Sequence, residues 1–107
     1  MELSKPIIHN AFPNPILFYK TNLSSDFHEN LINECLAWKE SSVGLKISNS
    51  GGWHSENTLF TREEPNIKKL CNVLVNATNK SILTISPSFA KDKYNLLAQG
   101  WVNIGSK

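Results

Sequence analysis

The chain has 107 residues, of which 40% are hydrophobic and 19% are charged. Its 11 Lys and Arg side chains against 9 Asp and Glu give a net charge of only +2, which argues against a nucleic-acid or membrane-surface protein. This length suits one hydrophobic core. We therefore expect residues 1–107 to form a single domain or the N-terminal fragment of a larger one.

Targeting and redox signals are weak in this sequence. The opening MELSKPIIHNAF has no basic start followed by a long apolar run, and no window reaches the roughly 20 apolar residues of a membrane span. Cys35 and Cys71 both lie within apolar helical patterns, so we expect reduced core residues rather than a disulfide. The sequence predicts a cytoplasmic protein that binds neither nucleic acid nor membrane.

The first predicted elements are a strand and a helix. The strand runs from Pro15 to Leu23 (PILFYKTNL), where strand formers follow a Pro-Asn-Pro sequence. The helix is capped by Ser24 or Ser25 and continues to about Lys39. Its apolar stripe has helical spacing and consists of Phe27, Leu31, Cys35 and Trp38, widened by Ile32 and Leu36. Its water-facing side is expected to hold His28, Glu29, Asn30, Asn33 and Glu34.

Turn residues dominate from Glu40 to Leu59, where Val43 to Ile47 is a candidate short strand. A second helix is predicted from Pro65, whose fixed φ suits the first turn, with Glu63 and Glu64 near its positive end. Its apolar face consists of Ile67, Leu70, Cys71, Leu74 and Ala77, and the helix ends before Pro87. A last strand is predicted from Tyr94 to Ile104, with Trp101 and Asn103 on one face and Val102 and Ile104 on the other. The predicted fold class is therefore α+β, with two amphipathic helices and short strands.

The stretch SNSGGWHSE, from Ser48 to Glu56, combines residue types that several chemistries use. His54 and Glu56 would share one face of a strand, a spacing found in non-haem iron sites. Such a site needs a second histidine, and only His9 and His28 remain, both earlier in the chain. We therefore predict a solvent-facing or hydrogen-bonded His54 rather than a metal ligand.

Two other interpretations of this stretch concern its serines and glycines. A nucleophilic Ser50 or Ser55 beside His54 is disfavoured, because adjacent loop residues rarely form that pair and no strand-turn-helix elbow surrounds them. The adjacent Gly51 and Gly52 permit a tight turn that fixes the direction of Trp53. Trp53 then either fills the core or lines a ligand cleft.

Two separated motifs resemble one family. Ser48, Asn49, Gly51, Gly52, Trp53 and Ser55 match a Ser-Asn-x-Gly-Gly-Trp-x-Ser motif, and Trp101, Asn103 and Ile104 match a later Trp-x-Asn-Ile strand. In this order and spacing the chain resembles the N-terminal part of 2-oxoglutarate- and Fe(II)-dependent oxygenases found in marine bacteria and in phages of cyanobacteria. The resemblance implies the front of a double-stranded β-helix (jelly-roll) whose core strands are missing.

The resemblance also implies where the chemistry lies. In that family the iron ligands and the basic residue that holds 2-oxoglutarate follow the Trp-x-Asn-Ile strand, so no catalytic or metal residue is assigned here. We expect no cofactor bound by this chain alone, with Fe(II) and 2-oxoglutarate implied for a completed hydroxylase. Expected partners are a missing C-terminal segment, or a second copy through the unpaired edge of the strand from Tyr94 to Ile104. The alternative is a complete small binding or interaction module without catalysis, in which Leu96, Leu97, Trp101 and Val102 form an interface.

Overall fold

The computed structural model describes residues 3–7, 14–46, 51–88 and 95–105. In chain order these residues form the helix α1 (Ser25–Ser41), the strand β1 (Trp53–His54), the short 3-10 helix η1 (Leu59–Thr61), the helix α2 (Pro65–Ile85) and the strand β2 (Asn103–Ile104). The strands make a two-stranded antiparallel sheet. The predicted α+β class is confirmed at this level.

Both helices begin where the sequence predicts. The Ser24 hydroxyl accepts a hydrogen bond from the backbone N of Phe27 at 3.2 Å and caps α1. Pro65 occupies the first turn of α2, and Lys68 N donates to Glu64 O at 2.9 Å. Since the Ser24 cap and the fixed φ of Pro65 both act locally, the sequence alone is enough to locate the two starts.

The apolar faces of the helices are only partly covered. Phe27 and Trp38 of α1 are buried, whereas Ile32 and Leu36 are 58% and 44% exposed. The predicted widening of the α1 stripe by these two residues is therefore wrong. In α2 the buried residues Ile67 and Cys71 lie in the first two turns. The apolar face continues beyond them, but Leu74 is already 42% exposed.

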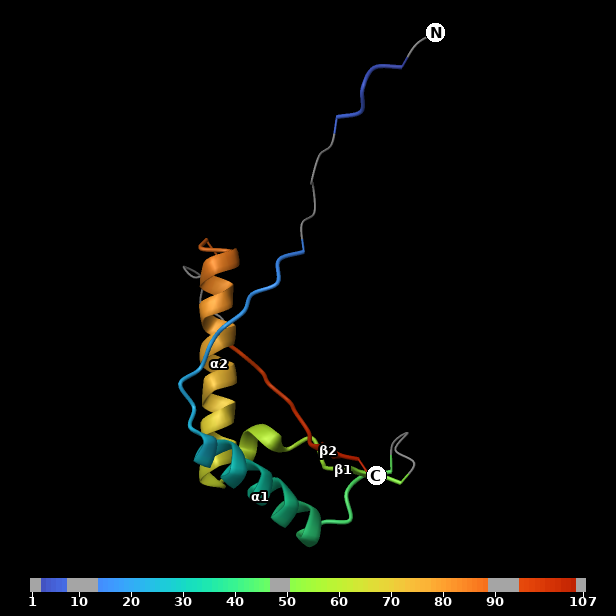
Figure 1. The fold of residues 1–107 in the computed structure, drawn as a ribbon, viewed down its shortest axis with the longest axis vertical. Helices are drawn as coiled ribbons and strands as arrows, with labels where there is room; N and C mark the ends of the chain where they lie inside the picture. The colour runs from blue at the N-terminus through green and yellow to red at the C-terminus, as the bar shows by residue number, and fades with distance from the viewer. Residues whose placement is uncertain (1–2, 8–13, 47–50, 89–94, 106–107) are drawn as a thin grey trace.

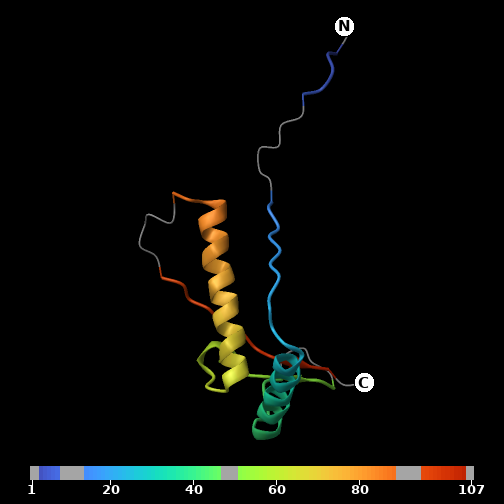
Figure 2. The same ribbon diagram turned by 60° about the vertical axis from the view of Figure 1, so that its left-hand side comes forward.

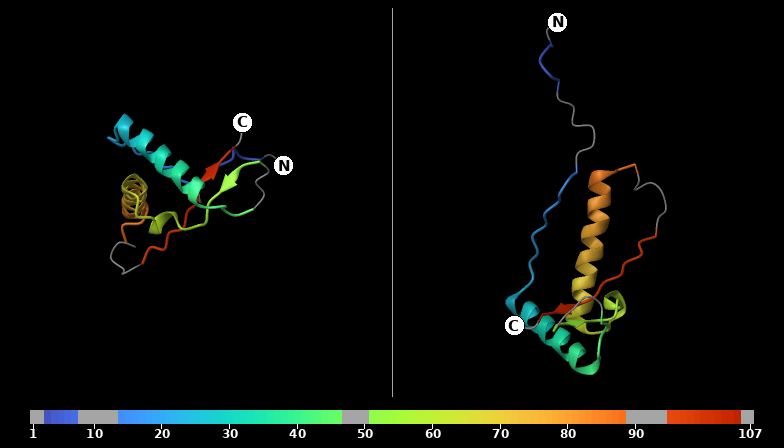
Figure 3. Two further views of the ribbon diagram at one scale, coloured as in Figure 1. Left: turned by 90° about the horizontal axis from the view of Figure 1, so that it is seen from below. Right: turned by 90° about the vertical axis from the view of Figure 1, so that its right-hand side faces the viewer.

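The core lies where α1 meets the N-terminal end of α2, close to η1 and the sheet (Figures 1 and 3). Its buried members are Trp38, Trp53, Leu59, Ile67 and Cys71. Val102 and Ile104 pack against this cluster, while Trp101 and Asn103 are exposed. The predicted alternation at the end of the chain is therefore confirmed.

The strands are much shorter than predicted. From the stretch Tyr94 to Ile104, only Asn103–Ile104 is a strand, preceded by a bridge from Gly100 to Thr58; Tyr94 lies outside the described residues. The candidate strand at Val43 to Ile47 is reduced to one bridge, between Leu45 and His54, and Ile47 is also outside them. The predicted strand at residues 15–23 is wrong, because this extended stretch forms no ladder with any part of the chain that the structure describes.

The arrangement is elongated. The radius of gyration is 20.3 Å and the principal extents are 70 × 37 × 28 Å, whereas a compact domain of this length has a radius of gyration of about 13 Å. Residues 3–7 lie away from the helices, and residues 14–23 run beside α2 (Figures 1 and 2). Within the described ranges, no helix combines the length and the apolar character that crossing a bilayer demands.

Candidate functional site

The two motifs of the family resemblance meet in the sheet. Trp53 pairs with Ile104 and His54 with Asn103. The arrows of β1 and β2 lie side by side in Figure 3. Ser48 and Asn49 lie outside the described residues. The other motif positions, Gly51, Gly52, Trp53, Ser55, Trp101 and Asn103, all lie on these strands or beside them.

Ser55 joins the two motifs through its hydroxyl. The side chain is fully buried, and its Oγ accepts a hydrogen bond from Val102 N at 2.8 Å while donating to Glu56 O at 2.8 Å. The Ser55 backbone N donates to Val102 O at 2.9 Å. Because the hydroxyl proton is directed at a carbonyl, Ser55 is a structural link between the strands. Neither hydrogen bond of the Ser55 hydroxyl involves His54.

Trp53 fills the core. Its side chain is 7% exposed and meets Trp38 edge to face, with ring centroids 5.8 Å apart and an interplanar angle of 78°. Its Nε1 donates to Ser42 O at 3.0 Å, so the buried polar atom is satisfied. Of the two predicted placements, core and cleft, the structure shows the core.

Glycines allow the backbone to close around Trp53. Gly44 has a φ of 71°, and a Cβ at this position would lie 2.5 Å from His54 O and 2.6 Å from Trp53 Nε1. Gly51 has a φ of 75°, which fits the predicted tight turn before the strand. Any side chain at position 44 would displace either the indole or the strand, a requirement that the sequence analysis did not identify.

His54 is held by its neighbours. Its ring stacks on Trp101, with centroids 5.5 Å apart and an interplanar angle of 17°. Its Nδ1 lies 2.7 Å from Ser55 O; because a carbonyl only accepts, Nδ1 carries the proton and donates. The predicted hydrogen-bonded state of His54 is therefore confirmed.

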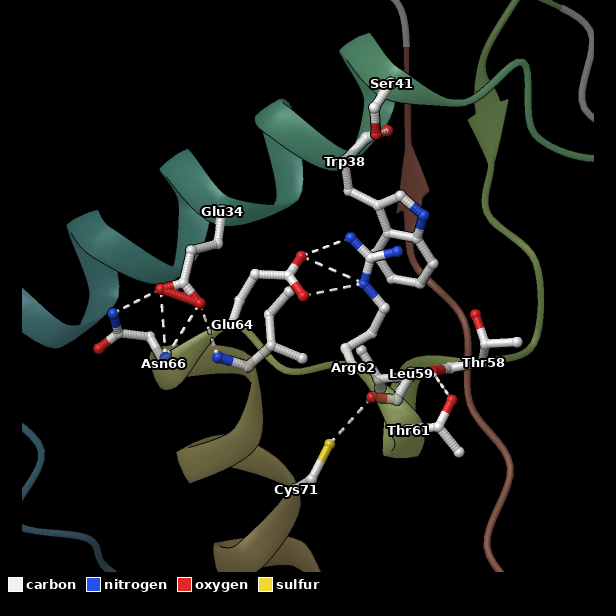
Figure 4. Close-up of polar contacts among 11 residues, drawn as sticks. Glu34, Trp38, Ser41, Thr58, Leu59, Thr61, Arg62, Glu64, Asn66 and Cys71 are labelled. Carbon is white, nitrogen blue, oxygen red and sulfur yellow. Dashed lines mark hydrogen bonds and ion pairs between the residues drawn. The ribbon is translucent and has the colours of Figure 1, made fainter.

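A second polar cluster, which joins the helices, was missed by the sequence analysis. The Glu34 carboxylate accepts hydrogen bonds from Asn66 N and Ile67 N, both at 2.9 Å, and from Asn66 Nδ2 (Figure 4). It thus caps the N-terminus of α2 from another helix. The prediction that Glu34 faces water is wrong. The available signal was its position within the apolar stripe, three residues after Leu31 and four before Trp38.

Arg62 completes this cluster. Its guanidinium carbon lies 4.1 Å from the centroid of the Trp38 ring, and its Nε donates to both Glu64 carboxylate oxygens, at 3.0 and 3.1 Å (Figure 4). The hydrogen bond from Arg62 lowers the pKa of Glu64. The arrangement covers one face of the Trp38 ring with a paired charge, which is a structural role.

The two cysteines are free thiols, as predicted. Cys71 is buried, and its Sγ lies 3.5 Å from Leu59 O; burial raises the pKa of this thiol. The pKa of Cys35 is raised by burial and by the nearby Glu34 and Glu64 carboxylates. Because only the thiolate is strongly nucleophilic, neither cysteine is activated by its surroundings.

Replacing Glu34 with Gln should destabilise the protein by about 1 kcal/mol, the usual cost of losing a helix cap. The amide keeps the size of the side chain but removes the charge that faces three N–H donors. Urea denaturation followed by circular dichroism measures the change. Glu29→Gln on the exposed side of α1 is the control and should have almost no effect. Equal losses in the two variants would contradict the capping role.

The Arg62 and Glu64 pair predicts a loss of stability in acid. The pKa of Glu64 is lowered from an ordinary value of 4.5, so its contribution is complete above that value and disappears as the pH falls through the lowered folded-state pKa. The free energy of unfolding, measured at several pH values from about 6 to about 3, should fall less steeply for Glu64→Gln than for the unmodified chain. Glu63→Gln, whose side chain is 88% exposed, should keep the original slope. A slope unchanged by Glu64→Gln would exclude the pair as its source.

Comparison of the chain with protein-family models, with curated proteins and with solved structures finds no match.

Proposed function

We propose that the chain is the N-terminal segment of a 2-oxoglutarate- and Fe(II)-dependent dioxygenase, a hydroxylase built on a double-stranded β-helix. One observation carries the proposal: the two motifs behind the resemblance pair with each other. Ser55 and Val102 are 47 positions apart in the sequence, yet they are joined by a backbone and a side-chain hydrogen bond. This pairing supports a common structural role for the motifs, the start of a larger sheet.

The residues described here do not fit an iron site. His54 uses Nδ1 to bind Ser55 O and stacks on Trp101, and His28 is an exposed residue of α1. Across the described ranges, no three His, Cys, Asp or Glu side chains are grouped closely enough to hold a metal ion. We derive no catalytic step for this chain. Under the proposal the iron ligands and the basic residue for 2-oxoglutarate come from sequence beyond Lys107, as in the family.

The test begins with the genomic sequence that follows the Lys107 codon. We expect it to encode histidines and an arginine on predicted strands, in the same frame or after a frameshift. The chain is then produced together with that segment, and succinate is measured after Fe(II), 2-oxoglutarate and oxygen are supplied. Succinate that depends on both segments supports the proposal. An unrelated gene, or no succinate from a folded complex, contradicts it.

Anaerobic Fe(II) titration of the 107-residue chain is the matched control. We expect no stoichiometric binding, because the imidazole of His54 is already engaged by its neighbours. Stoichiometric binding that His54→Ala abolishes would show that the chain carries its own metal site, contrary to this assignment.

A second candidate is a small, non-catalytic binding module. The exposed apolar surface favours it: Leu97 is 96% exposed and Trp101 is 51% exposed, and a hollow of about 240 Å³ lies between α2 and residues 96–98. A defined monomer or dimer in solution, together with an unrelated gene downstream, would favour the module over the oxygenase segment.

A further inference from the structure

Residues 15–23, called the strap below, lie along α2 without forming secondary structure (Figures 1 and 2). Their one hydrogen bond to the rest of the described chain joins Tyr19 Oη and Ser81 Oγ at 2.8 Å. Because Ser81 Oγ donates its proton to Ala77 O, Tyr19 is the donor. Lys80 Nζ lies 5.7 Å from the centroid of the Tyr19 ring. The strap is thus tied to α2 at one point near its middle.

The strap has the pattern of a strand whose partner is absent. None of its backbone N–H or C=O groups bonds to another described residue. Its side chains alternate, since Leu17 is half-buried and Tyr19 contacts α2, while Ile16 and Phe18 are 76% and 91% exposed. An extended segment with free backbone groups and apolar residues on both faces is a template for another strand.

An apolar groove borders the strap on α2. It has a volume of about 560 Å³, and six of its lining residues are Leu74, Ala77, Thr78, Ser81, Ile82 and Ile85. Ser81 belongs both to the groove and to the strap contact. Paired strands lie about 4.8 Å apart, and a helix with its side chains is about 10 Å wide. A strand paired with the strap can therefore also cover the groove. One extended apolar strand would thus satisfy both the free backbone groups of the strap and the apolar groove on α2.

The chain itself supplies a strand of this kind. We propose that two copies of the chain associate by antiparallel pairing of their straps, with each groove covered at the same interface. An antiparallel strand pair is self-complementary about a two-fold axis. With Phe18 opposite the partner's Phe18, Leu17 faces the partner's Tyr19 and Lys20 faces the partner's Ile16. Lys20 is the only charged residue of the strap, so this register sets no like charges opposite each other. The interface does not depend on any oxygenase activity.

Light scattering coupled to size-exclusion chromatography tests the interface on the full chain. We expect twice the chain's mass of 12.0 kDa at high concentration, with dissociation on dilution. Phe18→Pro removes a backbone N–H and should weaken the dimer at least about tenfold, while Ser4→Pro, in another exposed segment, should leave it intact. A single-chain mass at every concentration would overturn the proposal.

The groove is tested by a second pair of variants. Ile82→Glu places a charge in the groove and should also weaken the dimer at least about tenfold. Asn76→Glu, on the exposed opposite side of α2, should not. Helical circular dichroism, unchanged in all variants, confirms that α1 and α2 are intact. A dimer that survives both Phe18→Pro and Ile82→Glu would locate the interface elsewhere and overturn the proposal, without bearing on the succinate assay.

Discussion

Substitution of Trp53 with Ala should lower the free energy of unfolding by about 3 to 5 kcal/mol, the usual range for truncating a buried aromatic side chain. The indole is 7% exposed, meets Trp38 edge to face and donates to Ser42 O. Its loss removes apolar contacts, one aromatic pair and one hydrogen bond at once. Because folded domains have only about 5 to 15 kcal/mol of stability in total, this loss is a large share of it and should lower the urea midpoint clearly.

Trp101→Ala is the control for Trp53→Ala, since it removes the same side chain from a site that is 51% exposed. Its cost should be far smaller, because it loses mainly the stack on His54. Urea denaturation followed by circular dichroism compares the two variants. A Trp53→Ala midpoint equal to that of the unmodified chain would reject the core placement of Trp53.

The second large effect is expected for Ser55→Ala, at about 1 to 3 kcal/mol, the cost of a buried donor left without its partner. The substitution keeps the Cβ but leaves Val102 N without its acceptor at 2.8 Å and Glu56 O without its donor. Amide hydrogen exchange at Val102 should accelerate together with the loss of stability. If both measurements change together, the lost free energy of unfolding is assigned to the contact between Ser55 and Val102, where the two motifs meet.

Ser41→Ala provides the comparison for Ser55→Ala, because its hydroxyl also donates to a backbone carbonyl, that of Trp38, but from an exposed residue. Water can replace that bond, so we expect a loss of a few tenths of a kcal/mol at most. If Ser55→Ala and Ser41→Ala cost the same, the Ser55 hydroxyl does not join the strands.

The sequence alone was enough to predict where the two helices begin, because the residues that favour a helix start act on their immediate neighbours. Ser24 caps α1 and Pro65 starts α2, and each residue acts within one turn of its own position. The burial of Trp53 was one of two alternatives left open by the sequence. Gly51 and Gly52 predicted a fixed direction for the indole, but only the position of Trp38, 15 residues earlier, shows that this direction points into the core.

The strands could not be predicted to the same extent because pairing depends on distant residues. Strand formers fill residues 15–23 as well as 101–104, yet among the residues that the structure describes only the second stretch finds a partner, in β1. Both stretches have a high strand propensity, so propensity alone does not show which of them will be paired. Glu34 shows the same limit at the site: its position in the apolar stripe was visible, but the turn of α2 that it caps lies 32 residues further along.

That cap has a consequence for how the helices separate. The Glu34 carboxylate of α1 is the acceptor for two backbone N–H groups and one side-chain amide in the first turn of α2. Moving the helices apart therefore removes the acceptor of all three donors in a single step. The two helices are therefore expected to separate as one cooperative unit at this end.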